Sequence, residues 1–190
     1  MPKFAGHKLT GHPWRWYWLA LAVIAMDIAT KVWAVGEFRA GPPFQIIPGL
    51  LQFTYAENYG AAFSFLADAG GWQRWFFGVV AVGFSIMVIV WLWRLPASKR
   101  WEPFALGLIL GGALGNLWDR MVLGYVRDFI SVYYNTWSFP VFNVADMAIS
   151  VGAAMLVIEL LFFSDSDENG EQVAGHPGKD AKKSAETQKS

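Results

Sequence analysis

The sequence contains no cysteine, and its 190 residues include only three histidines. Without a thiol, disulfide bonds, thiolate nucleophiles and cysteine-ligated zinc are all excluded. The histidines, His7, His12 and His176, lie in the polar ends of the chain, away from the apolar runs. Neither a histidine-based zinc site nor a Ser-His-Asp triad is therefore expected within those runs. Carboxylates therefore remain as the candidate catalytic groups, and we expect no metal and no cofactor.

Charge is also scarce. Charged residues make up 16% of the chain, hydrophobic residues make up 55%, and there are 11 Trp and 15 Phe. The formal net charge is zero, and no basic stripe suggests a nucleic-acid partner. This composition is too apolar for a soluble domain of this length and indicates a membrane protein.

Long apolar runs are abundant. Four of them, at about 14–35, 72–95, 102–122 and 144–163, are long enough to cross about 30 Å of hydrocarbon. The first run could be a cleavable signal peptide, because a basic start precedes it. It is longer than a typical signal-peptide core and carries polar residues near its far end, which favours a retained helix. We expect a single membrane domain over residues 14–163.

Lysine and arginine gather before the first run, at residues 3–15, and between the second and third, at residues 94–100. Basic residues collect on the cytoplasmic side of membrane proteins. We therefore expect both chain ends in the cytoplasm and residues 36–71 and 123–143 on the extracytoplasmic side.

Residues 36–66 do not have a helical pattern. Proline and glycine punctuate their start, and residues 45–47 and 51–55 read as short strands. The expected fold class is therefore an all-α membrane protein, with four transmembrane helices and a small extracytoplasmic β-sheet region. Residues 1–13 are expected to be a cytoplasmic segment and the polar residues 164–190 a disordered cytoplasmic tail.

Two aspartates, Asp128 and Asp146, bracket a short aromatic loop between two apolar runs. A carboxylate in hydrocarbon costs about 2.5–3.5 kcal/mol at a helix centre, so its default interpretation is functional. Two carboxylates that come together can share one proton, as aspartic peptidases require. The pair predicts a membrane-embedded aspartic peptidase.

Other polar residues lie inside the runs. Asp27 and Lys31 are four apart and share a helix face, where they form either a structural ion pair or part of a site. Asn116 and Arg120 are candidates for fixing a substrate backbone, while Asp119 is expected to pair with Arg120 as a structural ion pair.

A ridge of small residues precedes these groups. Gly107, Gly111 and Gly115 recur every four residues, which lets another helix approach closely.

Five motifs follow one another along the chain: Asp27-x-x-Thr30-Lys31, Asn58-x-Gly60-Ala61-Ala62-Phe63, Gly112-Ala113-x-Gly115-Asn116-x-x-Asp119-Arg120, Gly124-x-Val126-x-Asp128-Phe129 and Phe142-Asn143-x-Ala145-Asp146. Together they resemble the motif set of bacterial lipoprotein signal peptidase, also called signal peptidase II. The resemblance covers about residues 14–163. It implies an inner-membrane enzyme with a periplasm-facing site, which removes the signal peptide before a diacylglyceryl-modified cysteine.

The resemblance also assigns roles. Asp128 and Asp146 correspond to the catalytic dyad, and further residues correspond to positions that line or brace the site: Asp27, Asn58, Gly60, Asn116, Arg120 and Asn143. The implied partners are lipidated prolipoprotein substrates and membrane lipids, and inhibition by globomycin-type cyclic peptides is expected. Arg127 departs from the family pattern, which has a valine there. If residues 125–130 are extended, we expect its side chain to face away from Asp128, toward lipid headgroups or solvent. If Arg127 instead folds back over the site, its charge favours the ionised dyad.

A rival interpretation is a small ion- or proton-coupled transporter in which Asp27, Asp119, Asp128 and Asp146 form a relay. Transporters usually have internal repeats and a polar path across the whole membrane, whereas the polar residues here cluster toward one face. A purely structural assembly factor would leave the clustered acids without a purpose.

Overall fold

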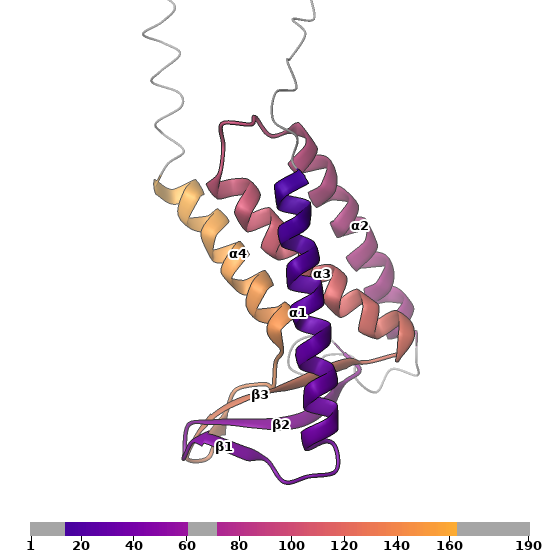
Figure 1. Cartoon of the computed structure of the whole chain (residues 1–190), viewed down its shortest axis with the longest axis vertical. Helices are drawn as coiled ribbons and strands as arrows, with labels where there is room; N and C mark the ends of the chain where they lie inside the picture. Colours follow the sequence, from indigo (N-terminus) through magenta and orange to yellow (C-terminus); the bar gives the residue numbers. More distant parts are fainter. Residues whose placement is uncertain (1–13, 61–71, 163–190) are drawn as a thin grey trace, which may run out of the picture. The chain divides into compact units, whose positions relative to one another are not determined.

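The computed structural model describes residues 14–60 and 72–162. The fold is mostly helical, with a small antiparallel sheet at one end of the helices (Figure 1). The elements in chain order are α1 (Trp14–Phe38), β1 (Phe44–Ile47), β2 (Leu51–Asn58), α2 (Gln73–Arg94), α3 (Trp101–Val122), β3 (Val126–Tyr134), β4 (Trp137–Ser138) and α4 (Val144–Phe162). The expectations for residues 1–13, for the end of the 36–66 region and for the tail at 164–190 lie outside the described residues.

The chain divides into two compact units, Met1–Met155 and Leu156–Ser190. All contacts discussed below lie within the first unit.

Three of the described helices are long and apolar enough to cross a membrane: Trp14–Phe38, Arg74–Arg94 and Val144–Phe162. The fourth predicted run, 102–122, does form the helix α3, but α3 carries Glu102, Asp119 and Arg120 near its ends. It is also rich in buried residues. Because α3 contacts its neighbours, it needs less apolar surface than a helix that faces lipid.

Glycines let α1 and α4 come close to α3. A methyl group added to Gly111 would lie 2.6 Å from Val23 Cβ on α1, and one added to Gly107 would lie 3.1 Å from Leu19 Cδ2. On the other side, a methyl group added to Gly152 of α4 would lie 2.6 Å from the carbonyl oxygen of Ala105. The ridge predicted from the spacing therefore contacts α1, and close backbone approach replaces side-chain interdigitation there.

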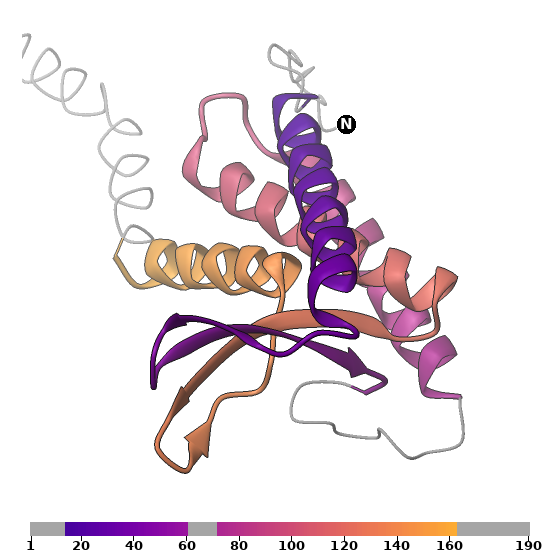
Figure 2. The same cartoon turned by 60° about the horizontal axis from the view of Figure 1, so that its bottom comes forward.

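The sheet has the order β1-β2-β3-β4, and each neighbouring pair is antiparallel. β1 and β2 match the two strands expected from the sequence. The register pairs Ala56 with Asp128 and Asn58 with Val126. Figure 2 shows β3 running beneath the helices, between β2 and the start of α4.

The strand β3 was not predicted, although its sequence of β-branched and aromatic residues favours a strand. Gly124, at φ 90°, ends α3 because the left-handed conformation is open to glycine, and its N–H donates to Arg120 O at 3.2 Å. The chain then reverses into β3, so the residues on both sides of Gly124 come back together.

An aromatic cluster joins α1 to the sheet. The Trp33 ring near the end of α1 lies 5.3 Å from the Phe53 ring of β2 and 6.3 Å from the Phe129 ring of β3, with both pairs edge-to-face. Such contacts add about 0.5–1.5 kcal/mol per pair beyond area burial. The cluster holds β3 against the end of α1 and thereby fixes the position of Asp128.

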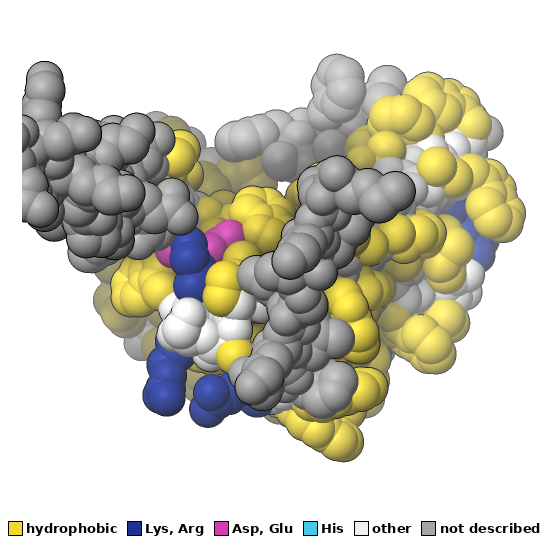
Figure 3. Space-filling model, turned by 90° about the horizontal axis from the view of Figure 1, so that it is seen from above, with side chains coloured by type: hydrophobic (Ala, Val, Ile, Leu, Met, Phe, Trp, Pro, Cys, Tyr) yellow, Lys and Arg dark blue, Asp and Glu magenta, His cyan; other side chains and the backbone are white. Residues whose placement is uncertain are grey.

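Large apolar side chains are exposed along the helices. Val79 on α2 is 72% exposed and Val151 on α4 is 51% exposed. Figure 3 shows hydrophobic side chains over much of the visible face. A surface of this kind suits lipid and not water, so the chain is an integral membrane protein.

Candidate active site

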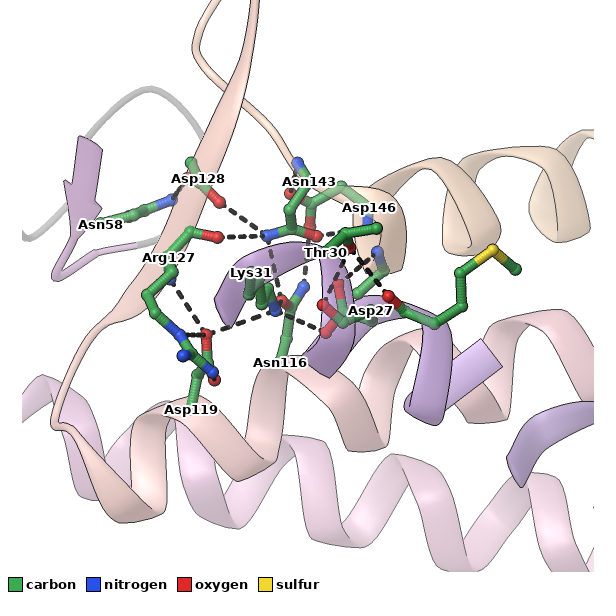
Figure 4. Close-up of polar contacts among 12 residues, drawn as sticks. Asp27, Thr30, Lys31, Asn58, Asn116, Asp119, Arg127, Asp128, Asn143 and Asp146 are labelled. Carbon is green, nitrogen blue, oxygen red and sulfur yellow. Dashed lines mark hydrogen bonds and ion pairs between the residues drawn. The ribbon is translucent and has the colours of Figure 1, made fainter. Parts of the chain in front are cut away.

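Buried polar side chains meet where α1, α3, β3 and the start of α4 come together (Figure 4). The fully or nearly fully buried members are Asp27, Lys31, Asn116, Asp119, Asp128 and Asn143. Burying so many polar groups is costly unless each has partners, and the hydrogen bonds below supply them.

Asp128 lies on β3 and is 2% exposed. Its Oδ2 accepts a hydrogen bond from Asn58 Nδ2 at 3.0 Å, and its Oδ1 accepts one from Asn143 Nδ2 at 2.6 Å. Asn58 lies on the paired strand β2, and its own Oδ1 accepts from the Gly60 N–H at 3.1 Å. Two amides from different elements therefore hold the carboxylate in one orientation.

The start of α4 is brought to Asp128 by β3. Phe142 forms an isolated bridge with Ile130, with N–H···O distances of 2.8 and 3.0 Å between their backbones. Asn143 follows directly and is the residue before the first turn of α4. This pairing places the head of α4 against the strand that carries Asp128.

Asn143 and Asp146 cap α4 reciprocally. The Asp146 N–H donates to Asn143 Oδ1 at 2.9 Å, and the Asn143 N–H donates to Asp146 Oδ2 at 3.2 Å. This is the geometry of a capping box with Asn and Asp in place of the usual Ser or Thr and Glu. Because Asn143 Nδ2 also donates to Asp128, one side chain ties together both aspartates predicted to be catalytic.

Lys31 sets the direction of the neighbouring amides. Its Nζ donates to Asn116 Oδ1 at 2.9 Å, and an ammonium group can only donate. Asn116 must therefore present its oxygen to Lys31, and its Nδ2 donates to Asp146 Oδ1 at 2.8 Å. The buried lysine thus orients a hydrogen-bond donor toward Asp146.

The predicted Asp27–Lys31 ion pair is present, with Lys31 Nζ 2.7 Å from Asp27 Oδ2. The other oxygen, Asp27 Oδ1, accepts from the Ala145 N–H at 2.9 Å. Asp27 therefore also caps the first turn of α4 from another helix. Gly115 leaves room for this carboxylate, since a methyl group there would lie 2.7 Å from Asp27 Oδ2.

Asp119 does not pair with Arg120 in the way expected. It pairs with Arg127, whose Nε donates to Asp119 Oδ2 at 3.1 Å and whose second guanidinium nitrogen donates to Oδ1 at 2.6 Å. Lys31 Nζ lies 3.4 Å from the same carboxylate. Adjacent residues on a helix do not face one another, which is why Arg120 points elsewhere.

Arg127 faces away from Asp128, but it does not reach solvent or headgroups, because its side chain is only 12% exposed and is held by Asp119. Figure 4 shows Arg127 and Asp128 leaving β3 in opposite directions. The fork is bidentate, which is the strongest arrangement for an arginine and a carboxylate. The interaction connects α3 to β3 immediately beside Asp128.

Arg120 is half-buried near the dyad. Its guanidinium donates to the carbonyl oxygen of Gly60 at 3.3 Å and lies 5.5 Å from the centre of the Phe77 ring. It also interacts electrostatically with Asp146 and Asp128. It joins the site to the end of the segment that leaves β2.

Burial, and after it the neighbouring charge of Asp146, raise the pKa of Asp128 to about 7, against the hydrogen bonds from Asn58 and Asn143, which favour the ionised form. Near neutral pH, Asp128 therefore exchanges a proton readily beside a second carboxylate. Two carboxylates with one proton between them form an acid and a base in one site.

Across residues 14–60 and 72–162, no group of three His, Cys, Asp or Glu side chains could hold a metal ion. The partners of Asp128 and Asp146 are amide donors, which suit carboxylates and not a cation. Fold and site together define an integral membrane protein with two neighbouring carboxylates, the buried Asp128 and the half-buried Asp146, at the sheet end of its helices.

Comparison with known proteins places the chain in a family. Residues 19–162 match the family model described as Signal peptidase (SPase) II. The lipoprotein signal peptidase of Yersinia pseudotuberculosis serotype O:1b is 48% identical over 155 residues, covering 82% of this chain and 90% of that protein. The protein of the same name from Yersinia pestis strain Pestoides F is 50% identical over 145 residues, covering 76% of this chain and 85% of that protein.

Solved structures agree with this. A bacterial membrane enzyme determined by the in meso method at 2.3 Å resolution superposes with a TM-score of 0.67 at 29% identity, covering 77% of this chain and 87% of that chain. A second, determined at 1.9 Å, gives 0.67 at 28% identity, covering 79% and 94%. This chain belongs to the signal peptidase II family, a family of proteases. The resemblance found in the sequence is thereby confirmed.

Proposed function

We propose that this chain removes the signal peptide from diacylglyceryl-modified prolipoproteins by cutting before the lipidated cysteine, with Asp128 and Asp146 as an aspartic dyad. The observation that carries the proposal is the Asn143 side chain, which hydrogen-bonds Asp128 and caps the turn of Asp146. Membership of the family supports the reaction, and the name of the relatives, lipoprotein signal peptidase, supports the substrate.

The two carboxylates have different tasks in this mechanism. Asp146, as the carboxylate, takes a proton from water while the water oxygen attacks the scissile carbonyl carbon. Asp128 gives its proton to the carbonyl oxygen, which forms a tetrahedral diol. When the C–N bond breaks, Asp146 gives its proton to the leaving amine and Asp128 takes a proton from one hydroxyl of the diol as the new carboxyl group forms, so the dyad again holds a single proton. No covalent acyl-enzyme forms.

Neighbouring groups position the peptide. The amides of Asn58 and Asn116 hold the two carboxylates, and Arg120 places a cation near them while donating to the Gly60 carbonyl oxygen. The buried set of Asp27, Lys31, Asp119 and Arg127 balances two positive charges against two negative ones. It therefore stabilises the site without adding net charge to the dyad. The diacylglyceryl chains lie against the exposed apolar faces of the helices.

The chain crosses the bacterial inner membrane four times, α3 included, with both ends cytoplasmic and the dyad at the extracytoplasmic face. The basic start of α1 and the basic α2–α3 connection, at the far end of the helices from the sheet, support this orientation (Figure 1). A reporter enzyme active only outside the cytoplasm should be active when fused after Asn135 and inactive after Ser98. The reverse pattern would overturn the topology.

The function is tested by incubating the purified chain with a prolipoprotein before and after diacylglyceryl transfer. We expect cleavage directly before the cysteine of the lipidated precursor only, and inhibition by a globomycin-type cyclic peptide. Cleavage of the unlipidated precursor at a similar rate would contradict the proposed specificity.

The pH dependence follows from Asp128. Below about pH 7 its carboxyl group holds the proton that the reaction needs, and above that pH Asp128 is ionised and the donor is lost. We expect kcat/KM to fall as the pH rises through about 7. Asn58→Ala removes a hydrogen bond that favours ionised Asp128, so it should raise this pKa and move the alkaline limb to higher pH. A limb that moves to lower pH would show that Asp128 is not the donor.

A further inference from the structure

A small cavity opens at the end of the helices away from the sheet. Arg15 and Trp16 of α1, Leu92 of α2, Lys99 of the α2–α3 connection and Pro103 of α3 line it, with a volume of about 80 Å³. A water molecule takes up about 30 Å³ in the liquid, so the cavity has room for one small polar group and not for an acyl chain.

The surroundings of the cavity are strongly basic. Residues 91–104 contain Arg94, Lys99 and Arg100 but only one acidic residue, Glu102, and Arg15 adds a further cation. Figure 3 shows Lys and Arg side chains on this end of the molecule. The chemistry of the cavity therefore favours an anion.

Glu102, a carboxylate beside the cavity, is engaged. Glu102 Oε1 accepts from Trp91 Nε1 at 2.8 Å, and its Oε2 lies 3.1 Å from Lys99 Nζ. Glu102 thus anchors Lys99 at the rim of the cavity. The Arg15 guanidinium lies 5.2 Å from the centre of the Trp16 ring. At the wall of the cavity, Trp16 therefore contacts Arg15 and Glu102 pairs with Lys99.

Tryptophans place the cavity at the depth of lipid headgroups. Trp14, Trp93 and Trp101 are 57%, 48% and 46% exposed, and Trp101 Nε1 donates to the carbonyl oxygen of Met155 at 2.9 Å. Exposed tryptophans are enriched where apolar helices leave the hydrocarbon. Any group that enters the cavity therefore comes from the headgroup layer.

We propose that this cavity binds the phosphate group of an anionic phospholipid, with Arg15 and Lys99 as its ligands. The planar fork of an arginine matches two phosphate oxygens, and the lysine adds a compact charge. Basic pockets between membrane helices on the cytoplasmic side bind anionic headgroups in this way. The acyl chains then lie in the bilayer along the apolar surface of α2, outside the cavity.

The proposal is tested by binding to the full chain purified in detergent. Phosphatidylglycerol is titrated in and bound lipid is counted by native mass spectrometry, with phosphatidylcholine and glycerol phosphate as parallel probes. We expect saturable binding of phosphatidylglycerol and weakening of about fivefold for Arg15→Gln and for Lys99→Gln. Arg15→Lys keeps the charge but loses the fork, so its affinity should fall between those of the parent and Arg15→Gln.

Arg100→Gln is the matched control, because it removes the same charge at the same end without changing the lining of the cavity. We expect it to weaken binding by less than about twofold. If Arg100→Gln and Arg15→Gln weaken binding equally, the attraction is diffuse and the site does not exist.

If glycerol phosphate binds as tightly as the lipid, the occupant is a free phosphate and the assignment to lipid is wrong. Should Arg15→Gln fail to fold, Lys99→Gln decides alone. The measurement does not depend on peptidase activity.

Discussion

Replacing Asp128 with asparagine is expected to abolish cleavage of the lipidated precursor, and the same change at Asp146 should abolish it as well. Asparagine keeps the size of the side chain but can neither accept a proton from water nor donate one to a carbonyl. A positioned acid or base contributes about 10²- to 10⁴-fold to the rate, so we expect kcat to fall at least that far in each variant. Substrate binding should change much less. Single-turnover cleavage in detergent measures the loss of rate, and capture of the uncut precursor by each variant measures substrate binding.

The matched control is Glu57→Gln. Glu57 lies on β2 beside Asn58 and is paired with Arg127 in the sheet register. Its carboxylate forms an ion pair with the exposed Arg39 at 3.4 Å. Among the described residues it has no hydrogen bond to Asp128 or Asp146. It should keep nearly full activity. The dyad is misassigned if Asp128→Asn still cleaves at a substantial rate while Asp119→Asn is well folded and inactive.

Replacing Asp119 with asparagine is expected to destabilise the protein strongly. Asp119 is fully buried and faces Arg127 at 2.6 Å and Lys31 at 3.4 Å. Removal of one partner from a buried ion pair leaves an uncompensated charge and costs about 3–5 kcal/mol. Thermal unfolding in detergent should show this loss. Exposed pairs contribute about 0–1 kcal/mol, so Glu57→Gln, which breaks the pair with Arg39, should unfold almost like the parent.

A second substitution tests whether charge is the cause. In the Asp119→Asn background, Arg127→Val removes the cation that has lost its carboxylate, whereas Lys31 keeps its pair with Asp27, so the change should restore part of the lost stability. In the parent protein, Arg127→Val removes the bidentate ion pair with Asp119 and should lower the free energy of unfolding. If the losses of stability caused by Asp119→Asn and Arg127→Val simply add in the double variant, the Arg127–Asp119 pair does not couple α3 to β3.

Much of the fold could be predicted because apolar length and composition are local properties of the chain. Helices formed close to all four predicted runs, and β1 and β2 formed where short alternating segments followed prolines. The strand β3 was not predicted, because the residues after Gly124 connect two apolar runs, where a loop is expected. Their β-branched and aromatic residues carried a strand signal, but pairing with β2 decides it.

The partner of Asp119 could not be found from spacing along one helix. Arg120 is adjacent in sequence, yet consecutive helical side chains point in different directions. Arg127 reaches Asp119 only because the chain reverses at Gly124 and because β3 alternates, so that Arg127 and Asp128 leave the strand on opposite sides.

The sequence by itself determined that this protein is membrane-embedded and which family it belongs to, and it predicts a chemistry that depends on carboxylates. These conclusions rest on composition, the absence of cysteine and the order of five motifs, none of which needs a contact map. Tertiary structure alone decided how the acids are held. The Phe142–Ile130 bridge brings α4 to β3, Asn143 then reaches Asp128, and Asp27 caps α4 from a helix 118 residues away in sequence. The orientation and protonation of a buried carboxylate depend on such distant donors and on burial, and neither can be read from its neighbours along the chain.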